Sequence, residues 1–164
     1  MSLENLADVQ LIAFDVDGVF TDGRFYLSDA GIESKTFNTQ DGFGVRRLLD
    51  AGISVAVISG RQSEAVARRM QELGVPHVIQ GCKDKVAALE AICTEIGLTP
   101  GQCAYVGDDI PDLPLLNQVG VSIAVANAVE TVRAQCDYLT QANGGSGAVR
   151  EVCDLLLSIR DERH

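Results

Sequence analysis

The chain contains 164 residues, of which 46% are hydrophobic and 22% charged, a composition typical of a globular protein rather than a disordered one. Its formal net charge of −10 argues against nucleic acid and anionic membranes as partners, and no apolar run approaches the roughly 20 residues of a membrane span. An anionic small substrate remains compatible with this charge, because the local field in a cleft outweighs the net charge. We expect one domain spanning residues 1–164.

The rare residue types narrow the chemistry and the compartment. The five cysteines are odd in number and widely spaced, with no C-x-x-C pair, so neither a disulfide framework nor a zinc site is expected. The N-terminus lacks the pattern of a secretory signal, and together these features favour the cytoplasm. Only His77 and His164 are histidines, so carboxylates rather than a histidine triad must carry any catalysis.

Apolar runs and turn residues alternate along the chain in the pattern of strands and helices. In chain order we expect a strand at 9–14, a β-hairpin at about 24–37, a helix at 41–51, a strand at 54–58, a helix at 63–73, a strand at 77–79, a helix at 83–96, a strand at 103–106, a helix at 112–119 broken early by Pro114, a strand at 121–124, a helix at 130–135, a strand at 137–139 and a helix at 148–159. Such alternation forms a parallel sheet through right-handed crossovers. The expected fold class is α/β, a single Rossmann-like three-layer domain with a parallel sheet, plus a β-hairpin flap and no cap domain.

The most informative junction is the end of the first strand, where Asp15-Val16-Asp17-Gly18 follows the apolar run. Open α/β sheets bind their ligands at the carboxyl ends of the strands. Two carboxylates two residues apart concentrate negative charge, and a divalent cation that prefers oxygen ligands, Mg²⁺ above all, relieves it. A structural explanation also stays open here, because Asp is a common turn former at strand ends.

Three further segments bring reactive groups to the same edge of the sheet. A Ser-Gly-Arg turn at 59–61 follows one strand, an acidic run at 107–112 follows another, and Lys85 opens the helix between them. Taken singly, each has a structural explanation as a turn, a solvated lysine or a helix cap. Because the carboxyl ends of parallel strands share one edge, the segments converge, and the combination predicts a magnesium-assisted phosphoryl-transfer site.

The order of these motifs over residues 9–125 resembles the haloacid dehalogenase superfamily of phosphohydrolases. The acidic pair at 15–18 is similar to the first motif of that superfamily, Ser59 to the second, Lys85 to the third and the run at 107–112 to the fourth. Four motifs in the correct order make the resemblance specific.

A narrower resemblance points to one family of phosphatases. The segments 17–23, 38–44 and 59–61, together with Ala-Val-Arg-Glu at 148–151, are similar to 3-deoxy-D-manno-octulosonate 8-phosphate phosphatases. Enzymes of that family act in the cytoplasm in lipopolysaccharide biosynthesis. The resemblance therefore implies a phosphomonoester hydrolase that takes this sugar acid phosphate.

The resemblance also implies a role for each motif residue. Asp15 would attack phosphorus and form an aspartyl-phosphate, while Asp17 would protonate the leaving oxygen and later deprotonate water. Mg²⁺ would be held by Asp15, Asp108 and the backbone carbonyl of Asp17. Ser59 and Lys85 would bind the phosphoryl oxygens.

Around this centre, the resemblance assigns supporting and substrate-binding residues. Asp109 and Asp112 would support the acidic loop or cap the next helix, and Asp109 is expected to matter more. The implied substrate contacts, with Lys85, are Asn38, Thr39, Gln40, Asp41, Gly42, Arg46, Arg61 and Arg69. The arginines suit the sugar acid because guanidinium binds carboxylate in a bidentate manner.

The motif spacing leaves no room for a cap domain, so the site needs another cover. Residues 16–58 and 60–84 contain little beyond the expected sheet elements. The unpaired edges of the hairpin could join equivalent hairpins, and relatives with this layout are tetramers. We therefore expect a homotetramer in which neighbouring subunits wall the site.

Other functions fit parts of the same pattern. A phosphatase for another sugar acid phosphate, of the nonulosonate 9-phosphate type, or a broad-range phosphatase would share the core motifs. A non-enzymatic Mg²⁺-binding receiver-like module also pairs acids with a lysine, but its phosphoacceptor Asp would stand where this chain has Ser59.

Overall fold

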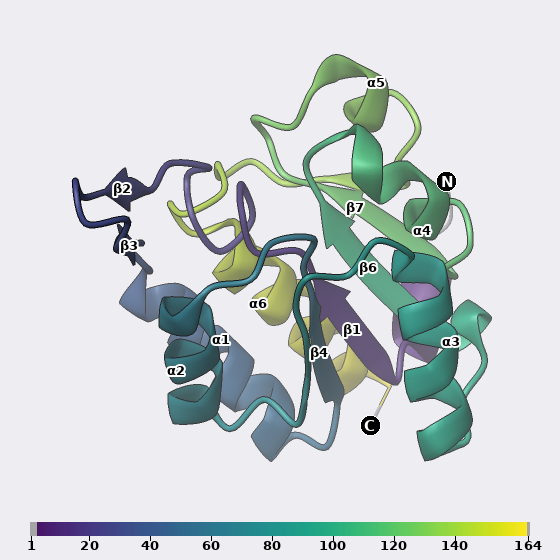
Figure 1. Ribbon diagram of the computed structural model, residues 1–164. Coiled ribbons are helices and arrows are strands. Elements are labelled where there is room, and N and C mark those ends of the chain that lie inside the picture. The colour runs from purple at the N-terminus through teal and green to yellow at the C-terminus, as the bar shows by residue number, and fades with distance from the viewer. Residues whose placement is uncertain (1–2, 164) are drawn as a thin grey trace.

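The computed structural model describes residues 3–163, in which helices and strands alternate (Figure 1). In chain order the elements are η1 (Leu3–Asp8), β1 (Leu11–Phe14), β2 (Tyr26–Leu27), β3 (Glu33–Ser34), α1 (Thr39–Asp50), β4 (Ser54–Ile58), α2 (Glu64–Leu73), β5 (His77–Ile79), α3 (Lys85–Ile96), η2 (Pro100–Gln102), β6 (Cys103–Gly107), η3 (Ile110–Asp112), α4 (Leu113–Leu116), β7 (Val121–Ala124), α5 (Glu130–Arg133), β8 (Tyr138–Leu139) and α6 (Ala148–Glu162). Residues 1–2, which belong to the N-terminal segment considered above, and His164 lie outside the described residues.

Six strands form one sheet in the order β5-β4-β1-β6-β7-β8. All neighbours in it are parallel, and Phe14 at the end of β1 stands opposite Val57 on one side and Val106 on the other. The carboxyl ends of β1, β4 and β6 therefore meet at one edge. The expected parallel α/β fold is confirmed, and residues 3–163 contain no cap domain.

Helices cover both faces of this sheet (Figure 1). α1 packs along α6 on one face, whereas α3 lies beside α4 on the other. Every residue of β1 is buried, because a strand between two helical layers meets apolar side chains on both faces. Beyond β1, the Phe20 ring packs edge-on against Phe14 with centroids 5.2 Å apart, which anchors the loop that follows the strand.

Capping side chains set several helix boundaries. At α2 the predicted ends are confirmed: Ser63 accepts a hydrogen bond from the Val66 amide, and Gly74 adopts a left-handed φ of 75°. α1 begins at Thr39, earlier than the expected residue 41, because Asn38 caps it.

Two further boundaries differ from the expectation. α3 begins at Lys85 rather than at residue 83, since the Asp84 side chain accepts a hydrogen bond from the Ala87 amide and ends the loop there. The predicted helix at 112–119 is wrong in extent, because α4 ends at Leu116. Pro114 lies in the first turn of α4, where its missing N–H is not needed, so it does not break the helix.

The hairpin stands outside the main sheet as predicted, although its strands are short. β2 and β3 pair only with each other, through Tyr26 with Ser34 and Leu27 with Glu33. Figure 1 shows the hairpin projecting from the body beyond α1. Its side chains at Tyr26, Leu27 and Ile32 are 70%, 65% and 66% exposed. Among residues 3–163, no helix has both the length and the apolar character needed to cross a membrane.

The glycine-rich segment before α6 lies directly against the loop that follows β1. The Gly145 amide donates to the Val19 carbonyl over 3.1 Å, and Asn38 Nδ2 donates to the Gly145 carbonyl over 3.5 Å. A Cβ at Gly144 would overlap the Gly18 carbonyl oxygen, so only glycine permits this approach. Residues from the far end of the chain thus support the loop that carries the first acidic pair.

Candidate active site

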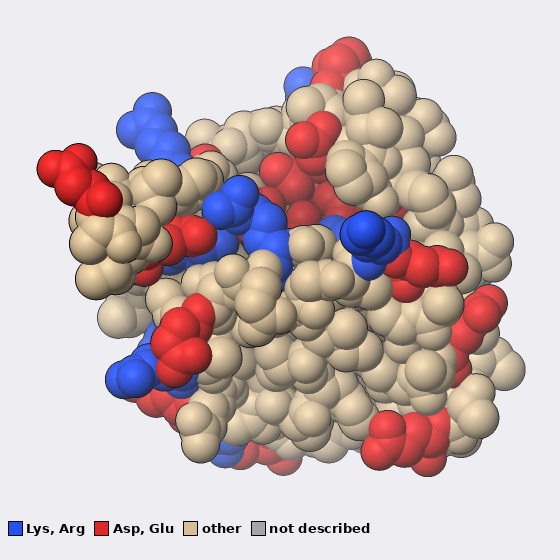
Figure 2. Space-filling view, in the orientation of Figure 1, with Lys and Arg blue, Asp and Glu red and all other residues tan. Residues whose placement is uncertain are grey.

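The four sequence motifs line one cavity of about 340 Å³ at the carboxyl edge of the sheet. Figure 2 shows acidic and basic side chains facing one another in this hollow, between the hairpin and the rest of the molecule. A larger cavity of about 910 Å³ lies at the opposite edge of the sheet and contains none of the candidate residues. The lining of the motif cavity comprises Asp15, Asp17, Gly23, Ser59, Gly60, Arg61, Cys82, Lys83, Lys85, Asp108, Asp109, Pro111 and Asp112.

Asp15 stands at the end of the buried strand β1 and is itself buried. Its Oδ1 accepts a hydrogen bond from the Val16 amide over 2.8 Å and lies 3.3 Å from Lys85 Nζ. Burial, followed by the charge of Asp112, raises the pKa of Asp15 to about 7, although Lys85 opposes the shift. In the metal-free protein this carboxyl is therefore about half protonated at neutral pH.

Lys85 lies between two carboxylates and a phenol. Its Nζ is 2.7 Å from Asp112 Oδ1, 3.3 Å from Asp15 Oδ1 and 3.2 Å from the Tyr105 hydroxyl. Burial disfavours the ammonium, but the charges of Asp15 and Asp112 outweigh it and raise the pKa of Lys85. The side chain is thus a fixed positive charge beside Asp15.

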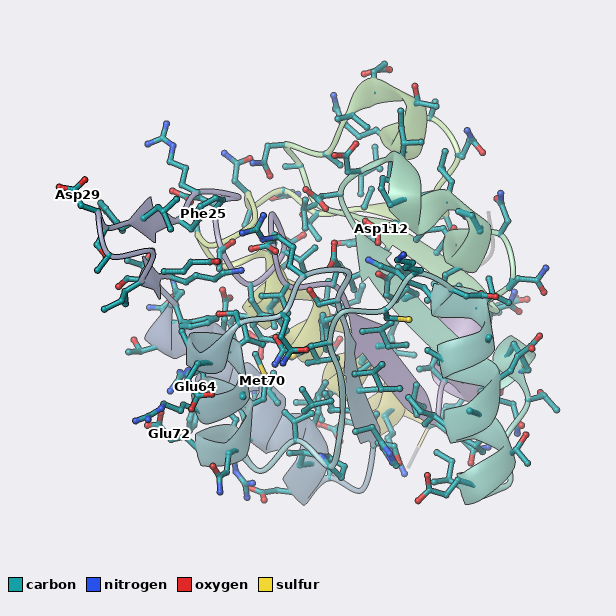
Figure 3. The ribbon with its side chains drawn as sticks, viewed as in Figure 1. Phe25, Asp29, Glu64, Met70, Glu72 and Asp112 are labelled. Atoms are coloured by element: carbon teal, nitrogen blue, oxygen red, sulfur yellow. The ribbon has the colours of Figure 1, made fainter. Side chains whose placement is uncertain are left out.

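Asp112 is fully buried at the carboxyl end of β6 (Figure 3). Its Oδ2 accepts the amides of Asp108 and Asp109 over 3.0 and 3.2 Å. Burial acts against its charge, but the Lys85 ammonium, together with hydrogen bonds from Lys85, Tyr105 and the Asp108 amide, keeps the pKa of Asp112 below its usual value. The neighbouring Asp109 is exposed and accepts a hydrogen bond from the Ile110 amide. Asp112 thus makes more contacts within the site than Asp109, which was expected to matter more.

Asp108 completes an acidic cluster with Asp15 and Asp112. One carboxylate oxygen from each of the three lies within 4.8 Å of the others. Burial and the charge of Asp15 raise the pKa of Asp108 to about 8. Gly18, with a φ of 83°, faces Asp108 so closely that a Cβ would overlap its carboxylate. The clustered oxygens of Asp15 and Asp108, whose pKa values are both raised, form a donor set that suits a hard divalent cation.

The side chain of Asp17 points to cations from two other segments. Its Oδ1 is 2.6 Å from Lys35 Nζ, and its Oδ2 is 3.9 Å from Arg61 Nε. Lys35 follows β3 of the hairpin and its side chain is only 1% exposed, while Glu33 pairs with both Lys35 and Arg61, at 3.3 and 3.1 Å. The Arg61 guanidinium also stacks on Phe25, 4.4 Å from the ring centroid. The hairpin is therefore joined to the site by charge.

Ser59 lies at the end of β4, where it is buried and lines the cavity. Its backbone amide donates to the Ile79 carbonyl over 2.9 Å, and its Oγ accepts the Arg61 amide over 3.4 Å. These bonds fix the turn and leave the hydroxyl proton free to donate to an anionic oxygen.

Known proteins are similar to this chain in sequence and fold. Residues 77–152 match the family model of haloacid dehalogenase-like hydrolases. The 3-deoxy-D-manno-octulosonate 8-phosphate phosphatase of Yersinia pestis is 42% identical over 160 residues, which cover 98% of this chain and 86% of that protein. The enzyme of the same name from Escherichia coli K12 is 44% identical over 150 residues, covering 92% and 80%. The chain belongs to the haloacid dehalogenase-like phosphatases.

Solved structures of relatives agree with the fold of this phosphatase. The Yersinia pestis crystal structure superposes with a TM-score of 0.95 over 98% of this chain and 86% of that one. The Moraxella catarrhalis enzyme, solved with a magnesium ion, a phosphate ion and a KDO molecule, is 43% identical with a TM-score of 0.94, covering 97% and 91%. A cobalt-bound relative from Haemophilus influenzae is 38% identical with a TM-score of 0.93, covering 96% and 92%.

Of the three arginines expected to bind substrate, the structure brings only Arg61 to the cavity of this phosphatase. Arg46 instead bonds the Leu73 carbonyl over 3.0 Å and pairs with Asp50 at 3.0 Å. Arg69 pairs with Glu72 at 3.2 Å and lies against Gly42, which leaves room for its guanidinium. Within one chain, these two arginines stabilise the contact between α1 and α2.

The segment from Asn38 to Gly42 also does structural work in the phosphatase. Asn38 caps α1, and Asp41 Oδ1 accepts the Arg150 amide over 3.0 Å at the start of α6. Asp41 is buried, and this burial raises its pKa. Only Thr39 and Gln40 are exposed in this first turn, where a ligand could reach them.

Two residues of the site escaped the sequence reasoning. Lys35 lies within the expected hairpin, and its spacing from Glu33, which places both charges on the same face of a strand, is the one sequence signal of its contact with the site. Tyr105 reads as an ordinary core aromatic in β6, and no local pattern connects it with Lys85 or Asp112.

Proposed function

We propose that this phosphatase hydrolyses 3-deoxy-D-manno-octulosonate 8-phosphate to the free sugar acid and phosphate, with Mg²⁺ as cofactor, in cytoplasmic lipopolysaccharide biosynthesis. The observation that carries the chemistry is the buried Asp15–Lys85 pair, 3.3 Å apart, beside Asp108. The names of the relatives at 42% and 44% identity support the choice of substrate. Five free cysteines in the described chain are compatible with a cytoplasmic location.

The donor set fits a magnesium ion. Asp15 and Asp108, with the backbone carbonyl of Asp17, supply the hard oxygen ligands that Mg²⁺ prefers. Asp112 is less suited to direct ligation, because both of its oxygens already accept hydrogen bonds. When bound, Mg²⁺ would neutralise phosphate and carboxylate charge so that the two anions can approach.

Asp15 is the nucleophile in this proposal. One of its carboxylate oxygens forms a bond to phosphorus, the bond from phosphorus to the sugar oxygen breaks, and an aspartyl-phosphate remains. Lys85, held as a cation between Asp15 and Asp112, binds the phosphoryl oxygens together with the Ser59 hydroxyl. Both groups are fixed before substrate arrives, so little reorganisation is needed.

Asp17 transfers the protons. It gives a proton to the leaving sugar oxygen and then takes one from the water that attacks the aspartyl-phosphate and restores Asp15. Lys35 and Arg61 hold its side chain toward the hairpin side of the cavity. Arg61, whose side chain is half exposed, is the group best placed to bind the carboxylate of a sugar acid.

We also propose that the phosphatase is a homotetramer built through its hairpins. Tyr26, Leu27 and Ile32 expose apolar surface on a two-stranded sheet with free edges, a surface typical of an interface. Four copies are what the family resemblance implies. Light scattering that finds a stable monomer at micromolar concentration would contradict this assembly.

The decisive assay is steady-state phosphate release from the octulosonate ester, with and without a chelator. We expect turnover that stops when EDTA is added and returns with excess Mg²⁺. A panel of sugar phosphates, including a nonulosonate 9-phosphate, tests the alternatives. Comparable turnover on short esters without a carboxylate would replace the octulosonate assignment with a broad-range phosphatase.

A further inference from the structure

Tyr105 is a fully buried residue of β6 whose hydroxyl reaches the acidic cluster from the protein interior. It does not line the cavity, so its oxygen has no access to a substrate. Burial, and then the charge of Asp112, raises the pKa of Tyr105 well above its ordinary value, so the phenol stays neutral. A buried, neutral hydroxyl beside charged groups must act through the partners it bonds.

The hydroxyl bonds two charged residues of the site. It donates to Asp112 Oδ1 over 2.6 Å and accepts from Lys85 Nζ over 3.2 Å. Lys85 also donates to Asp112 over 2.7 Å and pairs with Asp15 at 3.3 Å, so two of its N–H groups are held inside the protein and the third faces Asp15, where it can also reach a phosphoryl oxygen. The ammonium is thereby held in one orientation, directed at the proposed nucleophile.

Asp112 passes the constraint on to the acidic loop. Its Oδ2 accepts the amides of Asp108 and Asp109, while its Oδ1 accepts from Tyr105 and Lys85. A carboxylate offers about four lone-pair positions, and all of them are used here. The Asp112 carboxylate thus holds the loop that carries Asp108, and Tyr105 and Lys85 in turn hold that carboxylate in place.

We propose that Tyr105 is a positioning residue of the phosphatase: its hydroxyl fixes Lys85 against Asp15 and fixes Asp112 beneath the loop of Asp108. The kinetic part of this inference rests on the proposed function. Replacing Tyr105 by Phe removes the oxygen and keeps the ring, so core packing is preserved while Lys85 and Asp112 each lose a bond.

The chain offers a matched control in Tyr138. Its hydroxyl donates to Glu151 Oε1 over 3.0 Å, and Glu151 accepts the amides of Gln141 and Ala142. This arrangement repeats that of Tyr105 and Asp112 at a distance from the cavity. Tyr138→Phe therefore removes a comparable bond from a comparable loop without touching the phosphoryl site.

The test compares the two variants with the parent, after circular dichroism melting confirms that both fold. For Tyr105→Phe we expect kcat to fall roughly tenfold with KM within about twofold, the loss typical of one hydrogen bond between a neutral and a charged group that supports the transition state. Calorimetric titration with MgCl₂ should show a dissociation constant raised about threefold, since the loop of Asp108 loosens. Tyr138→Phe should match the parent in both measurements.

Several outcomes would overturn the inference. One is a folded Tyr105→Phe protein with the parent's kcat and Mg²⁺ affinity, and another is equal losses in both variants. A rise in KM with unchanged kcat would also overturn it, because it would indicate a role in substrate binding. If the parent itself releases no phosphate from the octulosonate ester, the proposed function fails, and the calorimetric comparison still decides the role of Tyr105.

Discussion

Magnesium binding should release protons from the acidic cluster. In the metal-free protein, burial and neighbouring charge raise the pKa of Asp15 to about 7 and that of Asp108 to about 8. Both carboxyls are therefore largely protonated at pH 6, whereas a metal ligand must be ionised. Roughly one to two protons should leave for each Mg²⁺ bound at pH 6, and nearly none at pH 9. By linkage, the apparent magnesium affinity should rise at least about tenfold per pH unit near pH 6 and level off above pH 8.

Calorimetry in paired buffers of different ionisation enthalpy measures this proton release directly. Asp108→Asn should lower the release by about one proton and weaken binding, because it removes one of the two protonated ligands. Asp109→Asn is the control, since Asp109 is adjacent but exposed and its side chain caps the start of η3. For Asp109→Asn we expect the same number of protons to be released on Mg²⁺ binding as in the parent. Binding at pH 6 without any proton release would refute the view that carboxyls protonated in the metal-free protein form this site.

Three further predictions test other parts of the site. Asp15→Asn should abolish phosphate release in a folded protein, and persistent release would remove Asp15 as the nucleophile. Gly18→Ala should weaken Mg²⁺ binding about tenfold and lower the free energy of unfolding by roughly 1–3 kcal/mol, since a Cβ there overlaps Asp108 and the φ of 83° is strained for alanine. Titration calorimetry measures the first effect and urea unfolding the second. Values equal to those of the parent would contradict the close packing of Gly18 against Asp108. In chelator, the raised pKa values of Asp15 and Asp108 contribute stability that is complete below about pH 4 and is lost as the pH rises to 8. The urea midpoint should therefore fall less over this range in Asp108→Asn than in the parent, and an equal fall would assign the loss to other groups.

The sequence was informative wherever a local pattern determines the structure. Buried strands alternate with helices that carry their own caps, such as Ser63 and Gly74 at α2, so the parallel sheet and the meeting of its strand ends could be predicted. The charge pairs between the hairpin and the site could not be predicted, because the contact of Lys35 with Asp17 depends on how the hairpin folds back over the loop that follows β1.

The same limit explains the residues whose contacts differ from the family-based expectation. Asn38 and Asp41 lie in a motif shared with relatives, yet within this chain they cap α1 and the start of α6. Tyr105 gave no signal, because its partners Lys85 and Asp112 come from separate elements. Sequence pattern identifies residues that act at strand ends, whereas tertiary contacts decide which buried polar group holds them.

The contact between the glycine-rich segment and the first acidic loop bears on how the enzyme is made. Residues 15–22 leave the ribosome well before Gly144 and Gly145, against which that loop rests. A nascent chain that ends before residue 143 lacks this support and also lacks α6, which packs along α1. Translation must therefore pass the glycine-rich segment and α6 before the loop that carries the first acidic pair has its full support.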